Sequence, residues 1–120
     1  MSKREPDVLL DDIARCILNL LKYTQDCTLE QFLNDQKTND AIVRNLEIIG
    51  EASSKLPTEF REKYNHIPWA RIIAMRNKMI HEYFELEEKV ICEVATCDAP
   101  ELYELVRKLL DELDSQHGYS

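Results

Sequence analysis

Apolar residues recur at helical spacing along most of the chain, with polar residues between them. From Pro6 to about Tyr23 they predict a first long helix, and proline suits its first turn because an N–H there would have no partner. A second long helix is predicted from about Thr38 to the residue before Pro57, since proline disfavours helical backbone in the preceding residue. The apolar faces consist of Val8, Leu9, Ile13, Ile17, Leu20 and Leu21 in the first helix and of Ile42, Val43, Leu46, Ile49 and Ala52 in the second.

Shorter helices are predicted around these two. Thr28 with Gln31 has the spacing of a capping box, in which each side chain accepts a hydrogen bond from the backbone of the other residue, and it opens a short helix. The range 58–64 is predicted to form another. Pro68 opens a further helix, which the apolar pattern carries to residues 81–83.

The C-terminal part is predicted to hold two helical segments in succession. The range 87–96 is the first, and Asp98 with Glu101 has capping-type spacing for the start of a last amphipathic run that reaches Leu113. Pro100 falls in the first turn of that run, where its missing N–H costs little, so the two segments are expected to be nearly collinear or joined by a bend.

Length and composition agree with a single helical domain. The 120 residues include only 2 Gly and 4 Pro, too few turn residues for a sandwich or barrel of many strands. We therefore predict an all-α, up-and-down antiparallel bundle of four to five main helices over residues 1–120, with a frayed tail at 116–120. No uncharged run approaches the roughly 20 residues that span a bilayer, and the N-terminus lacks the apolar core of a signal peptide. A cytoplasmic location without membrane contact is expected.

The charges and the cysteines of the chain limit the kinds of site that it can hold. With 15 basic and 23 acidic residues the formal net charge is -8, which disfavours unspecific coating of nucleic acid but leaves room for a local basic patch. The four cysteines form no CxxC pair, so neither a zinc site nor a disulfide framework is indicated, and we expect reduced thiols that mostly fill the core. They are Cys16, Cys27, Cys92 and Cys97.

The segment RNKMIHEY, which begins at Arg76, holds the most informative pattern. On a helix with about 100° per residue, Arg76 falls inside an apolar stripe. A guanidinium cannot shed its charge, so burying it requires a partner or a wet cleft. Beside the stripe runs a second line of Ala70, Ala74, Asn77 and His81, where the small alanines would let another helix approach closely. The stripe consists of Trp69, Ile72, Ile73, Arg76, Met79, Ile80 and Tyr83.

Arg76 lies in the apolar stripe and His81 in the neighbouring line of residues, so the two lie on either side of the boundary between them. This pair of residue types suits RNA cleavage by the substrate's own 2′-hydroxyl. His81 could transfer protons near neutral pH while Arg76 offsets negative charge on the phosphate, and no metal is required. Asn77 could orient the imidazole or hold the phosphate, and Tyr83 offers a hydroxyl on the Arg76 side. By spacing alone, a core-edge salt bridge and a structural histidine are the commoner interpretations of the first two residues.

The same segment resembles a known motif. RNKMIHEY matches the pattern of an arginine, four residues, a histidine, one residue and a tyrosine in the HepT-like toxins of the HEPN superfamily. Longer phrases also follow the family order, so the resemblance covers nearly the whole chain. They are DDIARCILNLLKYTQD, FLNDQKTNDAIVRNLEIIGEASSKLP and YNHIPWARIIAMRNKMIHEYF.

This resemblance implies an all-α HEPN bundle that acts as a homodimer, with the motifs of both protomers facing a shared cleft that RNA enters. It implies a metal-independent endoribonuclease without a cofactor, in which Arg76 and His81 are the catalytic pair and Asn77 supports them. It also implies an MNT-type nucleotidyltransferase antitoxin as partner, which transfers AMP to the motif tyrosine, here Tyr83, and so silences the toxin. The added phosphate would place negative charge where the substrate phosphate must lie.

The chain departs from the family pattern after the histidine. Glu82 and Glu85 stand where many members have glycine, and Cys92 stands where tryptophan is common. The two carboxylates would repel RNA or compete for Arg76, which would weaken catalysis without changing the fold. Two alternatives stay open: a non-catalytic HEPN module that binds a nucleotide or a nucleotidyltransferase through the same cleft, and a purely structural dimerisation bundle.

Overall fold

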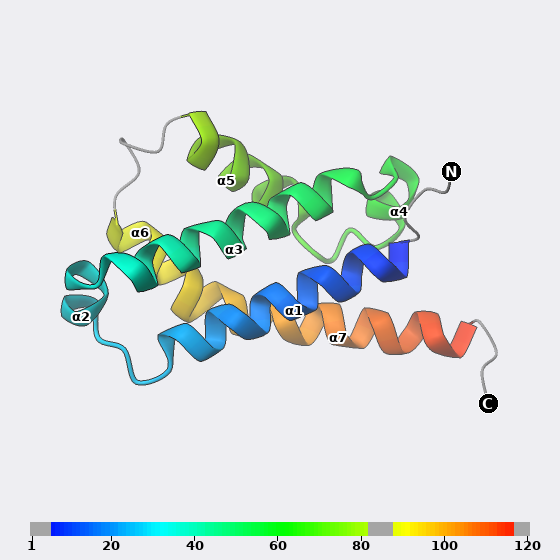
Figure 1. Cartoon of the computed structure of the whole chain (residues 1–120). Coiled ribbons are helices and arrows are strands. Elements are labelled where there is room, and N and C mark those ends of the chain that lie inside the picture. Colours follow the sequence, from blue (N-terminus) through cyan, green and yellow to red (C-terminus); the bar gives the residue numbers. More distant parts are fainter. Residues whose placement is uncertain (1–5, 82–87, 117–120) are drawn as a thin grey trace.

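The computed structural model describes residues 6–81 and 88–116. Within these two ranges the chain forms helices joined by short turns and contains no strand, which confirms the all-α prediction (Figure 1). None of the helices described is long and apolar enough to cross a bilayer. In chain order they are α1 (Pro6–Thr24), α2 (Leu29–Asn34), α3 (Gln36–Lys55), α4 (Thr58–Lys63), α5 (Trp69–His81), α6 (Glu88–Glu93), the π-helical turn η2 (Val94–Asp98) and α7 (Ala99–Gln116).

The long helices form an up-and-down bundle, as predicted. α1 packs against α3 and α7, and α5 packs against the other side of α3. Figure 1 shows that α1, α3, α5 and α7 run antiparallel in succession. The short α2 contacts α3 and α6 at one end of the bundle. α5 is thus held mainly by one neighbour, and the motif segment lies at the edge of the bundle.

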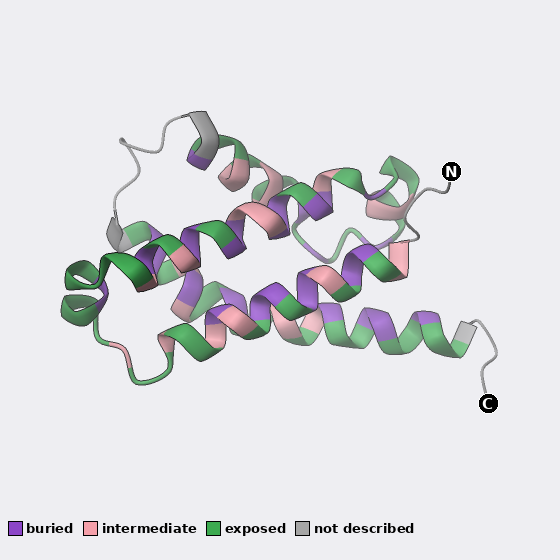
Figure 2. Cartoon of the chain, in the orientation of Figure 1, coloured by how far each residue is buried: buried purple, intermediate pink, exposed green. Residues whose placement is uncertain are grey.

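The core lies between α1, α3 and α7. The apolar face predicted for the first helix is enclosed there, with Ile13 and Ile17 fully buried, and the buried positions of α1 and α3 face each other in Figure 2. Val8, at the start of that face, is instead 42% exposed. A polar link joins the two helices, because Asn19 Nδ2 donates a hydrogen bond to Asn45 Oδ1 at 3.1 Å.

Two caps separate α2 from α3. The Thr28 hydroxyl accepts from the Gln31 N–H at 3.1 Å and Gln31 Oε1 accepts from the Thr28 N–H at 2.9 Å, so the predicted capping box is confirmed. α3 begins at Gln36, earlier than the predicted start, because the Asp35 carboxylate accepts hydrogen bonds from the Thr38 hydroxyl at 2.6 Å and the Thr38 N–H at 3.1 Å. These two hydrogen bonds hold the pKa of Asp35 below its ordinary value, and the bond from the hydroxyl has the larger effect.

The C-terminal segments form one continuous helical path rather than two capped helices. The backbone stays helical at Glu93 and Ala99, on either side of the π-helical turn, and the Ala99 N–H donates to the Val94 carbonyl. α7 begins at Ala99, at the predicted position, and it continues the preceding turn in the nearly collinear arrangement that was one of the two expected. Pro100 explains the π turn, because in an α-helix its ring would collide with the carbonyl four residues earlier, and a wider turn relieves that collision.

All four cysteines are free, as predicted. Cys16 and Cys92 are buried, whereas Cys27 is half-buried and Cys97 is exposed, so two of the four fill the core. Burial is the main reason that the pKa of each buried thiol is raised, and the nearby Asp12 adds to the effect at Cys16, as Cys27 does at Cys92. Both buried residues therefore stay as protonated thiols near neutral pH.

Candidate functional site

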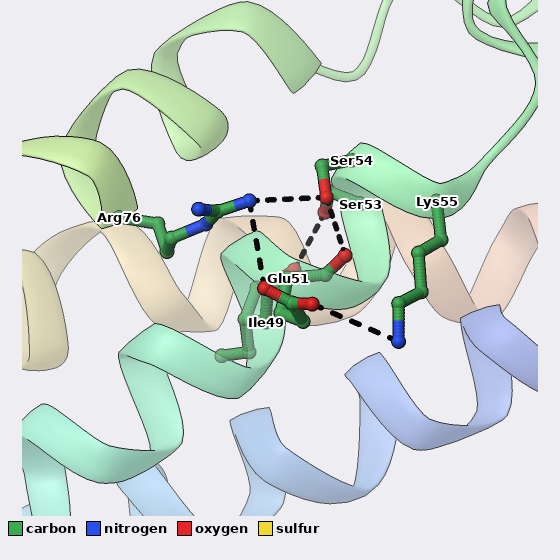
Figure 3. Close-up of polar contacts among 6 residues, drawn as sticks. All are labelled: Ile49, Glu51, Ser53, Ser54, Lys55 and Arg76. Carbon is green, nitrogen blue, oxygen red and sulfur yellow. Dashed lines mark hydrogen bonds and ion pairs between the residues drawn. The ribbon is translucent and has the colours of Figure 1, made fainter. Parts of the chain in front are cut away.

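Arg76 lies on the face of α5 that packs against α3, and its side chain is only 19% exposed. One terminal nitrogen, Nη2, lies 3.2 Å from the Ser54 hydroxyl and 3.5 Å from a carboxylate oxygen of Glu51, both on α3 (Figure 3). The inward position predicted for the arginine, with a polar or anionic partner, is confirmed.

Gly50 makes this approach between the two helices possible. A Cβ built at Gly50 would lie 2.7 Å from Cγ of Arg76 and closer still to its Cβ. Only glycine lets the arginine stem pass this close to the α3 backbone. The stem then carries the guanidinium to Glu51 and Ser54, which follow Gly50 on the same helix (Figure 3).

A small polar network surrounds the guanidinium. The Ser54 hydroxyl accepts from Arg76 and donates to the backbone carbonyl of Glu51 at 2.7 Å, so it is oriented from both sides. The second carboxylate oxygen of Glu51 lies 3.7 Å from Lys55 Nζ. The Glu51 and Lys55 side chains are 52% and 58% exposed, so the network opens to solvent. Exposed ion pairs of this kind contribute about 1 kcal/mol or less.

The three guanidinium nitrogens of Arg76 have different surroundings. Nη2 is held by α3, whereas Nε is buried and has no hydrogen-bond partner in the described part of the chain. Nη1 makes no hydrogen bond with the described residues. A permanent cation with an unused donor can bind an oxygen of a phosphate group.

The structure describes the remaining motif residues in part. Asn77 is exposed, and its side chain makes no hydrogen bond within the described ranges. His81 is the last residue of α5, so it shares a helix with the arginine as predicted, and its side chain lies outside the described part of the chain. Tyr83 lies outside the described residues, as do Glu82 and Glu85.

The close helix contact differs from the one expected. Ala70 and Ala74, predicted to admit a neighbouring helix, are exposed together with Asn77, so the described helices leave this line uncovered. Gly50 on α3 admits the close contact instead. The reason is steric: the Arg76 stem already fills the α5 side of the contact, so the space must come from the facing helix.

An apolar cleft of about 220 Å³ lies apart from these residues, between α1, α3, α5, η2 and α7. Ile72 and Met75 line it from α5, and Leu102 and Leu105 line it from α7. None of the predicted site residues lines this cleft. Among the described residues, no group of three or more His, Cys, Asp or Glu side chains is arranged to hold a metal ion.

Sequence reasoning missed the roles of Gly50, Glu51 and Ser54. The clue was a glycine inside a predicted helix, in a chain that has only 2 Gly. Such a glycine costs about 1 kcal/mol relative to alanine, so it usually has a packing reason. Glu51 and Ser54 are three residues apart and therefore share a helix face. These signals together mark this turn of α3 as a contact, although they do not identify its partner.

Comparison with known proteins shows which family and which individual proteins this chain is similar to. Residues 13–109 match the HepT-like family, described as ribonuclease HepT-like. A protein of Methanocaldococcus jannaschii, named a gamma-glutamylcyclotransferase and putative RNase, is 40% identical over 93% of this chain, which spans 50% of that protein. Another protein of this organism, named a putative RNase, is 35% identical over 97% of this chain and 100% of its own length. A protein of Thermococcus cleftensis, named a probable ribonuclease HepT, is 39% identical over 88% of this chain and 99% of its own length. No solved structure matches the chain significantly.

Proposed function

This chain belongs to the ribonuclease HepT-like family, and from that membership we propose that it is a metal-independent endoribonuclease, the toxin of a HEPN/MNT toxin–antitoxin pair. The active form in this proposal is a homodimer in which the motifs of both protomers face one cleft. The family match carries the proposal. The surroundings of Arg76 support it, because α3 holds one terminal nitrogen of the arginine while the other makes no hydrogen bond with the described residues.

Cleavage in this proposal begins with attack of a 2′-hydroxyl of the RNA on the adjacent phosphorus. His81 takes the hydroxyl proton and a bond forms between the 2′-oxygen and phosphorus. The bond to the 5′-oxygen breaks as that oxygen takes a proton from water, and His81 returns its proton to the solvent. The products carry a 2′,3′-cyclic phosphate and a 5′-hydroxyl. Arg76 stabilises the negative charge that grows on the phosphate oxygens, and Asn77 supports the imidazole or the phosphate.

RNA cleavage in the presence of EDTA tests this mechanism. Wild-type protein is expected to cleave, and His81→Ala is expected to lose the activity while keeping its helical circular dichroism, because the imidazole transfers the protons. His66→Ala is the matched control, since His66 is exposed in the turn before α5, and it should cleave as wild type does. Unchanged cleavage by His81→Ala would refute the mechanism. A wild-type protein that binds a nucleotide without cleaving RNA would instead indicate the non-catalytic module.

Silencing by the partner would act through Tyr83. An MNT-type nucleotidyltransferase transfers AMP from ATP to the tyrosine hydroxyl and releases pyrophosphate. The hydroxyl oxygen gains a bond to phosphorus and loses its proton. The added phosphate then repels the substrate phosphate and competes with it for Arg76.

Intact-mass measurement after incubation with such a partner and ATP tests the modification. Wild-type protein is expected to gain the mass of AMP, and Tyr83→Phe is expected to gain nothing. Tyr103→Phe, which removes the hydroxyl of a half-buried tyrosine on α7, is the matched control and should be modified like wild type. AMP on the Tyr83→Phe protein would show that the acceptor is another residue.

A further inference from the structure

We propose that Glu51 is a positioning residue for Arg76, whose carboxylate holds the guanidinium in the free protein and is displaced from it by a phosphate of bound RNA. The proposal rests on the ribonuclease function proposed above. It adds to that function an acidic residue of the chain itself that sets the affinity of the same site for RNA.

The contact between Glu51 and Arg76 is loose enough to be exchanged. Nη2 of Arg76 lies 3.5 Å from Oε2 of Glu51, which is longer than the roughly 2.7–2.9 Å of a good hydrogen bond between a cation and a carboxylate. The Glu51 side chain is 52% exposed, so water already competes for it. A phosphate oxygen that arrives from solvent can therefore replace the carboxylate.

The arginine has little freedom to avoid this competition. Its Cβ and Cγ pack over Gly50, which fixes the stem against α3. The Ser54 hydroxyl holds Nη2 from one side at 3.2 Å. A phosphate that pairs with both terminal nitrogens must compete for Nη2, which the Ser54 hydroxyl and the Glu51 carboxylate already contact.

Glu51 keeps an ion-pair partner when it leaves Arg76. Its Oε1 lies 3.7 Å from Nζ of Lys55, one turn further along α3. The carboxylate can turn wholly to Lys55 while the phosphate takes its place beside the arginine. The charge that orients Arg76 in the free protein therefore also lowers the affinity for RNA, because it occupies Nη2 and repels the phosphate.

Glu51→Gln tests the proposal, because the amide oxygen can still accept from Nη2 while the negative charge is removed. Binding is measured by fluorescence anisotropy with an RNA whose 2′-hydroxyls are methylated and which cannot be cleaved. We expect Kd to fall by up to about fivefold at low salt, the magnitude of an exposed ion pair. The difference should shrink at high salt because the charges are screened. With cleavable RNA, KM should fall while kcat changes less.

Two further variants separate this effect from others. Glu112→Gln removes the same charge from an exposed position on α7 that has no ion pair with the described residues, and it is expected to leave Kd unchanged. Ser54→Ala removes the other contact of Arg76 without changing the charge, and it is expected not to tighten RNA binding. Circular dichroism confirms that all three variants are folded.

Each outcome decides between the two proposals. If Glu51→Gln binds RNA no better than wild type, or if Glu112→Gln tightens binding equally, the role of Glu51 is refuted, and cleavage by the wild-type protein would still support the ribonuclease function. If the wild-type protein neither binds nor cleaves RNA, the ribonuclease function is refuted and the role of Glu51 is refuted with it.

Discussion

The guanidinium nitrogens of Arg76 differ in their surroundings, because Nη2 is bound to α3 and Nε is not. Nε is buried and has no partner in the described part of the chain, and an unpaired buried donor costs about 1–3 kcal/mol. Such groups are uncommon in folded proteins and often have a functional explanation. The proposed role of Arg76 would provide one, because the packing that buries Nε also holds the terminal nitrogens in position for a substrate phosphate.

Arg76→Lys tests whether the shape of the guanidinium matters in addition to its charge. Lysine keeps the positive charge but lacks the planar fork that contacts α3 and a phosphate at the same time, so kcat/KM for RNA cleavage is expected to fall by at least about tenfold. The measurement is RNA cleavage in EDTA. Arg71→Lys makes the same change at an exposed position of α5 and is expected to cleave like wild type. Equal activity of the two variants would contradict a specific role for Arg76.

The contact between α3 and α5 depends on the absence of a side chain at Gly50. Gly50→Ala is expected to lower the free energy of unfolding by about 1–2 kcal/mol, because overpacking against Arg76 costs more than alanine gains from its helix propensity. Urea unfolding measures the change. Lys37→Ala, at an exposed position of α3, is the control and should not lower stability. A stabilised Gly50→Ala protein would mean that helix propensity outweighs the contact.

The start of α3 makes stability depend on pH. Hydrogen bonds from Thr38 lower the pKa of Asp35 in the folded protein. The resulting stabilisation is present above the ordinary pKa of the carboxyl and is lost as pH falls through the lowered, folded value. Asp35→Asn keeps a capping oxygen that cannot titrate, so it should lose less stability than wild type as pH falls below the ordinary pKa of an aspartate. Thermal unfolding measures this difference. Asp114→Asn, at an exposed position of α7, is expected to follow wild type.

On the scale of the whole molecule, the described helices leave one side of α5 uncovered. Its packing within the chain is mainly with α3, and Ala70, Ala74 and Asn77 are exposed. The proposed second protomer could approach the motif from this open side. Because the formal net charge is -8, two copies repel each other at long range, and the proposed dimer needs specific short-range contacts to form.

Mixing two inactive variants tests whether the proposed cleft is shared. Arg76→Ala and His81→Ala are each expected to be inactive alone and to recover part of the activity after subunit exchange. One cleft of the mixed dimer would hold an intact arginine from one protomer and an intact histidine from its partner. RNA cleavage is measured before and after mixing, and native mass spectrometry with one variant labelled with ¹⁵N verifies that mixed dimers form. No recovery in verified mixed dimers would mean that the two residues act within one protomer.

The amino-acid sequence by itself determined the helices and their order, because apolar periodicity, caps and prolines act over a few neighbouring residues. The capping box at Thr28 and the helix end before Pro57 could be predicted in this way. The π-helical turn before Pro100 could not, because a proline in the first turn of a helix is compatible with both a bend and a collinear path. The site chemistry was suggested by Arg76 and His81, and their assignment as a catalytic pair came from the family resemblance.

Only the tertiary structure decided what faces Arg76. Helical periodicity shows that the arginine points inward, but the residues it meets depend on how α5 lies against α3. The acids expected to compete for Arg76 were Glu82 and Glu85, which lie outside the described residues. Among the described residues, the acid that the structure brings to Arg76 is Glu51, which is distant in the chain. That contact arises because the glycine next to Glu51 allows two helices to approach, and packing between segments distant in the chain has no signature in local periodicity.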